Sequence, residues 1–279
     1  MKNRIVSLGL AAALGLPLAA YADPLSVFQP THVRAVSVTP TDVRAIRALP
    51  PLEAFGTVRG TRAPGIDEVG SATEAAQDAG YALRLPAAVP ANLSKDVHYQ
   101  VTQRARTTFT FSQAKAAAWA REHKVALRPL PGGLDGATYT TTLQPVTVVT
   151  YGTMPRTRTK HGARGRSFLA IVQAPVPTVS SNGASLQTLT DWFAAQPGIS
   201  KQLVAQIKAI GDPTQTLPIP VRFNEQTATK ITVDGAQGLA IGDETGIGTA
   251  IVWTKDGKLY AVAGTFPQSE VLALANDLR

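Results

Sequence analysis

The sequence predicts an α+β fold in which antiparallel sheets have helices packed on one face. Strand-like segments with alternating apolar and polar residues dominate the C-terminal quarter, and helical segments stand apart from them along the chain. A helix followed by strands recurs around 71–151 and 185–278, which leaves open an arrangement in two similar halves. The apolar fraction of 44% and the charged fraction of 16% are typical of a globular chain with a sizeable core.

The N-terminal part of the chain contains one well-marked helix between strand-like segments. The predicted elements are a strand at Val33–Val38, a helix at Val43–Leu49, a loop at 60–70, a helix up to Ala79 and a strand at Tyr81–Pro86. Ser71 and Glu74 form a capping box, in which Ser71 accepts from the Glu74 amide and Glu74 hydrogen-bonds back to the amide of Ser71. Gly80 is expected to end this helix in a left-handed conformation.

The middle of the chain alternates between strands and helices. The predicted elements are a hairpin of His98–Thr102 with Thr107–Phe111, a helix at Gln113–His123, a loop at Pro129–Gly136, one or two strands within Thr138–Tyr151 and a strand at Phe168–Gln173. Ser112 is expected to cap the helix, because a serine hydroxyl accepts from the amides of the first turn.

The C-terminal part contains the strongest local signals. The predicted elements are a turn at Asn182-Gly183, helices at Leu186–Phe193 and Ser200–Ile210, strands at Val221–Phe223, Ala228–Val233, Gly238–Ile241, Thr249–Trp253 and Leu259–Val262, and a helix from Ser269 to Leu278. Asp256-Gly257 separates two apolar runs and therefore predicts a two-residue hairpin. Ser269 is expected to cap the terminal helix.

The first 22 residues have the parts of a secretory signal. Lys2 and Arg4 precede an uncharged apolar run, and Ala20 and Ala22 occupy positions −3 and −1 of the expected cut. The run is shorter than the ~20 residues that span a bilayer comfortably. Cleavage after Ala22 is predicted, with an uncleaved N-terminal membrane anchor as the alternative. The protein is therefore expected to be extracytoplasmic, either periplasmic or secreted.

The predicted organisation has three parts: a signal peptide at 1–22, an N-terminal strand or linker segment at 23–70, and an α+β extracytoplasmic domain at 71–279. The chain contains no cysteine, which excludes disulfides, thiol catalysis and thiolate metal sites. The net charge is +8 for the full sequence, and it becomes +6 without the two basic residues of the signal. A basic balance favours encounter with anionic surfaces, and it also promotes solubility.

Several segments together resemble a bacterial extracytoplasmic domain of unknown function. In many relatives this domain follows the membrane helix of anti-sigma-factor-like proteins. The segments that carry the resemblance are Phe28–Pro30, Leu49–Gly56, Ala75–Tyr81 with Leu85-Pro86, Val252–Tyr260 and Leu272–Leu278. The resemblance implies an α+β sensor-like domain without an established catalytic site. The chain departs from the anti-sigma arrangement, because no cytoplasmic zinc-finger segment precedes its apolar run.

No motif in the sequence points to catalysis or to a bound metal. A serine hydrolase would carry Gly-x-Ser-x-Gly, which is absent. The four histidines form none of the short spacings of metal sites. Gly246-Ile247-Gly248 lacks a third glycine and is followed by a strand, so it is expected to be a hairpin loop and not a phosphate site. The sequence therefore predicts no enzyme and no catalytic, cofactor-binding or metal-ligating residue.

One basic segment is the only candidate binding feature. It contains five basic residues and no acid, namely Arg156, Arg158, Lys160, Arg164 and Arg166. Such a run is either a solvated loop or a contact for anionic lipid headgroups. Nucleic acid is not expected, because the segment lacks the aromatic residues on which bases stack. The three tryptophans Trp119, Trp192 and Trp253 lie in periodic apolar settings and are expected to pack in the core.

Together these features predict an exported, non-enzymatic envelope protein that binds or senses, with an envelope protein or an anionic membrane surface as its partner. The alternative is a periplasmic carrier of an apolar or lipid ligand, with a cavity between a curved sheet and the helices at 185–210. No cofactor is expected, and the small-molecule ligand, if there is one, is not identified by the sequence.

Overall fold

The computed structural model describes residues 30–41, 44, 50–60, 64–90, 93, 97–152, 167–196, 201, 204–205, 215–222, 226–243 and 248–279. The strands are β1 (His32–Val38), β2 (Gly56–Gly60), β3 (Ile66–Val69), β4 (Val97–Thr102), β5 (Ala105–Phe111), β6 (Thr138–Leu143), β7 (Thr147–Gly152), β8 (Phe168–Pro175), β9 (Thr178–Asn182), β10 (Thr216–Arg222), β11 (Gln226–Val233), β12 (Ala236–Asp243), β13 (Thr249–Lys255) and β14 (Lys258–Gly264). The helices are η1 (Leu52–Ala54), α3 (Ala72–Ala79), α4 (Gln113–His123), α5 (Leu186–Ala194) and α7 (Gln268–Asn276).

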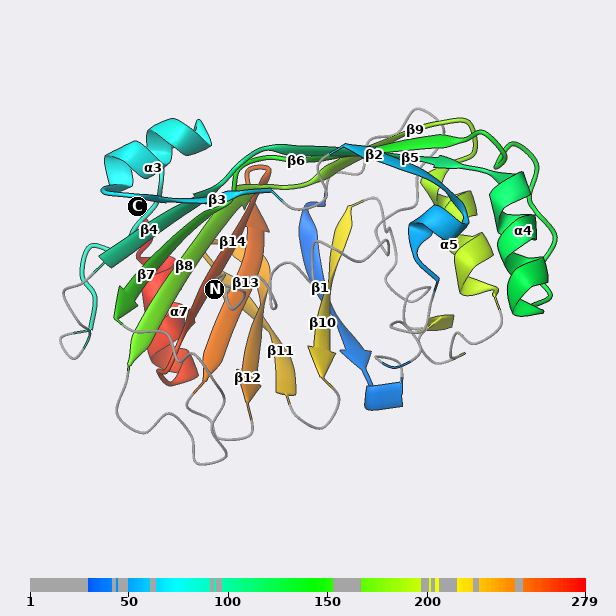
Figure 1. Ribbon diagram of the computed structural model, residues 1–279. Coiled ribbons are helices and arrows are strands. Elements are labelled where there is room, and N and C mark those ends of the chain that lie inside the picture. The colour runs from blue at the N-terminus through cyan, green and yellow to red at the C-terminus, as the bar shows by residue number, and fades with distance from the viewer. Residues whose placement is uncertain are drawn as a thin grey trace.

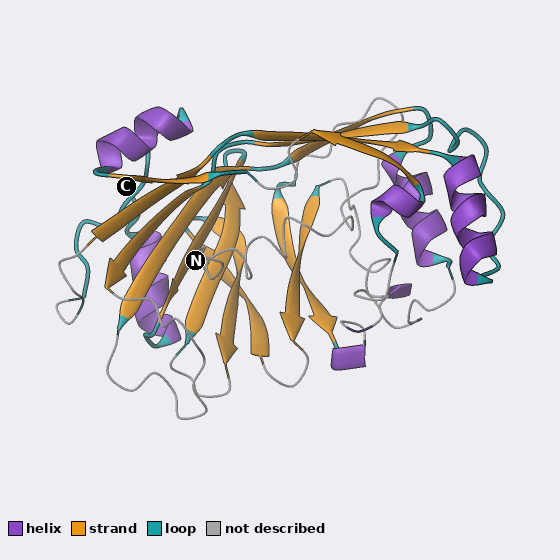
Figure 2. Ribbon diagram, viewed as in Figure 1, coloured by secondary structure: helices purple, strands orange, loops and turns teal. Residues whose placement is uncertain are grey.

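Antiparallel sheets form most of the fold, so the predicted α+β class is confirmed at that level. An eight-stranded sheet has the order β11-β12-β13-β14-β8-β7-β4-β3, and a four-stranded sheet has the order β2-β5-β6-β9. The third sheet is a parallel pair of β1 and β10. Figure 1 and Figure 2 show the two large sheets as a curved surface, with β1, β10, α4 and α5 on its inner side.

Long bent strands join the eight-stranded and four-stranded sheets. β4 pairs with β7 while β5, which follows β4 after only two residues, pairs with β6. β6–β7 and β8–β9 likewise pass from one sheet to the other (Figure 1). Pro145 lies in the β6–β7 bend and Pro177 in the β8–β9 bend, where the missing N–H of proline interrupts a ladder. The predicted hairpin of 98–102 with 107–111 is therefore wrong, because these segments are consecutive parts of one bent strand.

The two faces of the eight-stranded sheet belong to two different hydrophobic cores. On β13, Val252 packs in the core that contains α5, whereas Ile251 and Trp253 pack in the core that contains α7. Successive side chains of a strand point to opposite faces, so the two cores lie on opposite sides of the sheet. We call the first the aromatic core and the second the outer core.

The parallel pair lies on the inner side of the curved sheet. β1 packs against β12 and β13, and Val36 and Val38 are buried. The Thr254 hydroxyl of β13 donates to the carbonyl of Thr31 at 2.5 Å, just before β1 begins. Strands β1, β2 and β3 come from the segment that the sequence assigned to an N-terminal strand or linker, and all three are part of the sheets.

The helix caps agree closely with the sequence. Ser71 accepts from the Glu74 amide at 3.1 Å, and Gly80 ends α3 with φ of 75°. Glu74 hydrogen-bonds to the amide of Gly70, whereas the capping box predicted a bond to the amide of Ser71. Ser112 accepts from the Lys115 amide at the start of α4.

Several predicted elements differ from the structure. The loop predicted at 60–70 contains β3, and Tyr81–Pro86 is an extended segment with a single β-bridge, from Pro86 to Leu278. Ser269 is not a cap, because α7 begins after Pro267 without a side-chain cap. The helices predicted at 43–49 and 200–210 lie largely outside the described residues.

The finer predictions of the fold are not confirmed. Side chains of α5 pack in the aromatic core, whereas α7 packs in the outer core. These two helices therefore lie on opposite sides of the curved surface that the two large sheets form. The strands of the first predicted half form the bent strands, whereas β11–β14 form a simple meander. The described residues therefore do not repeat one topology in two halves.

Gly60 is required by the backbone at the end of β2. Its φ is 102°, and a Cβ built there would overlap the carbonyl oxygen of Arg106 on β5. We expect Gly60→Ala to lower the free energy of unfolding by about 2 kcal/mol, through backbone strain and this overlap. Gly80→Ala is the control, because Gly80 also has positive φ but has open space around it, so it should lose only about 1 kcal/mol. Urea denaturation measures both, and equal losses would contradict the role of the Arg106 contact.

Candidate functional site

The five basic residues singled out by the sequence are not placed by the structure. Arg156, Arg158, Lys160, Arg164 and Arg166 all lie within 153–166, outside the described residues. The predicted signal at 1–22 also lies outside them. The described part of the chain offers two other arrangements, a network of polar contacts and a cluster of aromatic side chains.

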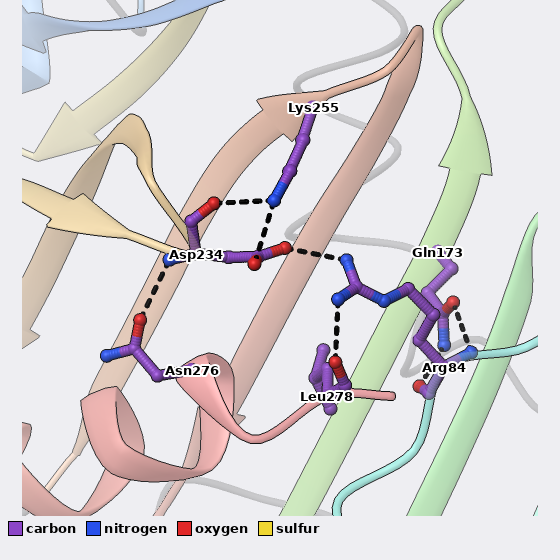
Figure 3. A network of polar contacts seen from close by, with 6 residues as sticks. All are labelled: Arg84, Gln173, Asp234, Lys255, Asn276 and Leu278. Atoms are coloured by element: carbon purple, nitrogen blue, oxygen red, sulfur yellow. Dashed lines mark hydrogen bonds and ion pairs between the residues drawn. The ribbon is translucent and has the colours of Figure 1, made fainter.

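The polar network is centred on Asp234 at the tip of the β11–β12 hairpin (Figure 3). Asp234 and Gly235 have φ of 50° and 72°, which is a type I′ turn. The Asp234 carboxylate accepts from Arg84 Nη1 at 2.6 Å and from Lys255 Nζ at 2.8 Å. The Lys255 ammonium also donates to the Asp234 carbonyl, at 2.7 Å. One carboxylate therefore holds two cations from distant parts of the chain.

The same network includes the end of α7. The Asp234 amide donates to Asn276 Oδ1 at 2.8 Å, and Arg84 Nη2 donates to the Leu278 carbonyl at 2.7 Å. Leu85 and Arg279 exchange two backbone hydrogen bonds, at 3.1 and 3.2 Å. We call Arg84, Gln173, Asp234, Lys255, Asn276 and the Leu278 carbonyl the polar clasp. It fastens the C-terminal residues and the segment after α3 to one end of the eight-stranded sheet, near the β11–β12 turn.

The side chain of Gln173 holds the backbone of Arg84. This side chain is completely buried, and it accepts from the Arg84 amide at 2.9 Å and donates to the Arg84 carbonyl at 2.7 Å. The carbonyl of Gln173 in turn accepts from the Tyr81 hydroxyl at 2.6 Å. Burial raises the pKa of Tyr81, so this hydroxyl remains a proton donor at neutral pH.

The electrostatics of the clasp favour a fixed ion pair. Partial burial alone would raise the pKa of Asp234, but hydrogen bonds from Lys255 and Arg84 outweigh it and hold this pKa below its ordinary value. A carboxylate with a lowered pKa is a poor general base. Both of its oxygens are already hydrogen-bonded, so the chemistry of this group is structural: it holds three chain segments together.

The rings of the aromatic core gather where the four-stranded sheet meets the helices α4 and α5. Phe55 contacts Trp119, Trp192 and Phe193 at ring-centroid distances of 5.6, 5.8 and 5.1 Å. Phe111 on β5 meets Trp192 edge to face at 5.2 Å. Offset and edge-to-face pairs at these separations stabilise a core beyond the area that they bury.

Helix α5 is held in this core by hydrogen bonds to the loop after α4. Trp192 Nε1 donates to the Arg128 carbonyl at 3.2 Å, and Gln196 Oε1 accepts from the Arg128 amide at 3.1 Å. Gln196 also donates to the Trp192 carbonyl at 2.7 Å. The loop and α5 therefore form one covering layer over the inner face of the sheet.

Two hydroxyl groups in this region have no hydrogen-bond partner among the described residues. Thr190, on the buried side of α5, is only 5% exposed, and its Oγ1 is unpartnered. Ser181 Oγ on β9 is also unpartnered and buried, and Ser181 lies directly across from Tyr139 of the aromatic core. The Tyr139 hydroxyl has only a long contact, 3.4 Å, to the Ser185 carbonyl, and burial raises the pKa of Tyr139 to about 12. Buried polar groups are normally hydrogen-bonded, so unpartnered ones mark positions that a bound molecule can complete.

The tryptophans follow the prediction in part. Trp192 and Trp253 are buried and Trp119 is partly buried in the aromatic core, as expected of packed side chains. Trp253 lies in the outer core, on the opposite side of the sheet from Trp119 and Trp192. A single cage of three tryptophans is therefore excluded.

Sequence reasoning did not find the clasp or the unpartnered hydroxyls. Arg84 and Asp234 are 150 residues apart, and no local pattern marks such a pair. The only available signal was Asp234-Gly235, which predicts the turn but not the partners of its carboxylate. Thr190 lies within a stripe of apolar residues at helical spacing, and nothing in that pattern shows that its hydroxyl lacks a partner.

Among the described residues, no group of three or more His, Asp or Glu side chains is placed to hold a metal ion. None of the described helices combines the length and apolar character needed to cross a membrane. Comparison of the chain with protein-family models, with curated proteins and with solved structures gave no significant match.

Proposed function

We propose that this chain is an exported, non-enzymatic protein of the bacterial envelope that acts by binding, and that the aromatic core is the place at which it holds an apolar ligand. The signal-like N-terminus supports export. The resemblance to the extracytoplasmic domain of anti-sigma-factor-like proteins supports a sensor-like role in which ligand binding is transmitted to an envelope protein partner.

The observation that carries the proposal is the pair of unpartnered hydroxyls beside the aromatic side chains. Ligand sites in proteins are mostly apolar, with a few polar groups that orient the ligand. An acyl chain packed among aromatic rings would leave its head free to bond to Thr190 and Ser181. Leaving these hydroxyls without a partner costs about 1–3 kcal/mol each, which a bound head group would recover.

The second candidate is a periplasmic carrier of an apolar or lipid ligand. The curved sheet with α4 and α5 on its inner side favours it (Figure 1), because a curved surface and a cover are the parts that enclose a chain-like ligand. A carrier and a sensor share the ligand and differ in the step after binding: a carrier releases the ligand to an acceptor, and a sensor changes its affinity for a partner. The basic segment Arg156–Arg166 is retained as a proposed contact for anionic headgroups.

Native mass spectrometry with lipid extraction, on mature protein from its own envelope fraction, tests the proposal. We expect a co-purifying acyl species. We also expect Thr190→Val to weaken its retention about 5- to 10-fold while raising or preserving thermal stability, because valine has the same shape and removes an unpartnered hydroxyl. Thr108→Val is the control, because the Thr108 hydroxyl bonds to Thr140 at 3.3 Å, away from the helices.

Two results would contradict the ligand site. One is protein that carries no acyl species and shows no change in tryptophan fluorescence with added palmitate or lysophospholipid. The other is equal retention by Thr190→Val and the unsubstituted protein, which would place the ligand elsewhere.

A further inference from the structure

The eight-stranded sheet ends in an edge strand with unusual features. β11 is eight residues long and pairs with β12 over its whole length, one residue against one, without a bulge. Gln226–Val233 contains no proline and one charged residue, Lys230. Thr227, Ala228, Thr229 and Lys230 are all exposed. No backbone hydrogen bond joins β11 to a described residue outside β12.

The turn geometry identifies the backbone groups that face outward. In a hairpin with a two-residue turn, the residues that flank the turn exchange both backbone hydrogen bonds, and such pairs recur at every second position. Val233 and Ala236 flank the turn, so Thr229 bonds to Ala240 of β12. The amides and carbonyls of Ala228, Lys230 and Thr232 therefore point away from the sheet.

Two other edges of the described sheets, at β3 and β10, are protected. β3 has only four residues and carries Asp67 and Glu68. β10 has prolines at 218 and 220, and their nitrogens must face away from β1, so this edge presents no donors at those positions. Short strands, charges and prolines are the usual ways of preventing strand addition. β11 is neither short nor interrupted by proline, and Lys230 is its single charge.

We propose that β11 is a docking edge for an extended segment of another protein, which adds to the sheet as a ninth strand. Backbone hydrogen bonds to the outward groups of 228, 230 and 232 would provide the affinity, and alternate side chains the specificity. Lys230 is the only charge on the strand and the mature chain is basic, so the segment that fits carries an acidic residue beside Lys230. This edge is separate from the aromatic core, and the inference does not depend on the apolar ligand.

A second copy of the chain is a less favourable occupant. Two antiparallel β11 strands must pair their outward-facing positions with each other. The two most complete registers place Lys230 of each copy opposite either Ala228 or Lys230 of the other, so the two lysines lie near each other on one face. Both molecules also carry net positive charge. Like charges on neighbouring strands are destabilising.

The test uses the mature protein and two capped eight-residue peptides, one of alternating valine and glutamate and one of alternating valine and lysine. Backbone amide exchange is measured residue by residue. We expect the glutamate peptide to slow exchange at Ala228, Lys230 and Thr232 at least 10-fold, and the lysine peptide to have little effect. Lys230→Glu should reverse this preference without changing the backbone.

Two proline variants separate edge binding from folding. Lys230→Pro removes an outward amide, so it should fold and lose the protection by the peptide. Thr229→Pro removes an amide bonded to β12 and should lower Tm strongly. Equal protection of Lys230→Pro and the unsubstituted protein would overturn the proposal. So would a dimer in sedimentation velocity that Lys230→Pro abolishes, because the occupant would then be a second copy.

Discussion

Replacing Trp253 with alanine is expected to lower the free energy of unfolding by about 4 kcal/mol, the largest single effect that we anticipate. Trp253 is completely buried at the centre of the outer core, and its ring stacks on Tyr260 of β14 at 5.2 Å. The same core contains Val271 and Ala275 of α7, both fully buried. Alanine would leave a large cavity between the sheet and this helix, and rigid strands collapse poorly into cavities.

Trp253→Phe is the matched control. The indole Nε1 of Trp253 is buried and has no hydrogen-bond partner among the described residues. Phenylalanine keeps most of the stacking and removes this unsatisfied donor, so the two effects partly offset each other, and we expect a loss of about 1 kcal/mol. Urea denaturation followed by circular dichroism measures both variants. Similar losses for alanine and phenylalanine would contradict the role that we assign to the volume of the ring.

Replacing Asp234 with alanine is expected to cost about 3 kcal/mol, because it removes the anion between two cations and leaves Arg84 and Lys255 without it. Alanine also adopts the left-handed conformation at φ of 50° poorly. Asp234→Asn is the control for the charge, because asparagine tolerates this conformation and still accepts one hydrogen bond. Asp234→Asn should therefore lose less free energy of unfolding than Asp234→Ala, by at least the cost of placing alanine in the left-handed conformation. If alanine and asparagine lose equal amounts, the turn conformation contributes nothing.

The clasp also gives stability a defined dependence on pH. The folded pKa of Asp234 is lower than its ordinary value, so the unfolded chain binds this proton more readily than the folded chain does. The contribution of Asp234 is therefore complete above the ordinary aspartate pKa and is lost as the pH falls through the lowered folded pKa. Denaturation of the unsubstituted protein and of Asp234→Asn between pH 6 and pH 2 should show that the difference in the free energy of unfolding between them shrinks in the acid range.

Local chemistry allowed much of the chain to be predicted. Ser71, Ser112 and Gly80 define helix ends through hydrogen bonds within three or four residues, and the structure has them at those positions. Asp256-Gly257 has positive φ at both residues, as the predicted two-residue hairpin requires. These features depend on neighbours in sequence, which the sequence displays directly.

The pairing of strands could not be obtained in this way. Alternation in 98–102 and 107–111 indicates two strands, but it is the same for a hairpin and for one bent strand. The partners of these segments, β7 and β6, lie further along the chain and decide between the two. The candidate ligand site depends on the same long-range pairing, because Ser181 and Tyr139 meet only through the β6–β9 ladder.

The parallel pairing of β1 with β10 has a consequence for the order in which the chain can fold. Thr31 and Gln215, which open this pairing, are 184 residues apart in sequence. If the chain is exported N-terminus first, as we propose, β1 therefore emerges from the membrane pore long before its partner does. Until β10 arrives, β1 is an unpaired apolar strand, and contacts of such long range slow folding and expose the chain to aggregation. β1 cannot pair before β10 arrives, so an exported chain of this design would benefit from a holding chaperone on the far side.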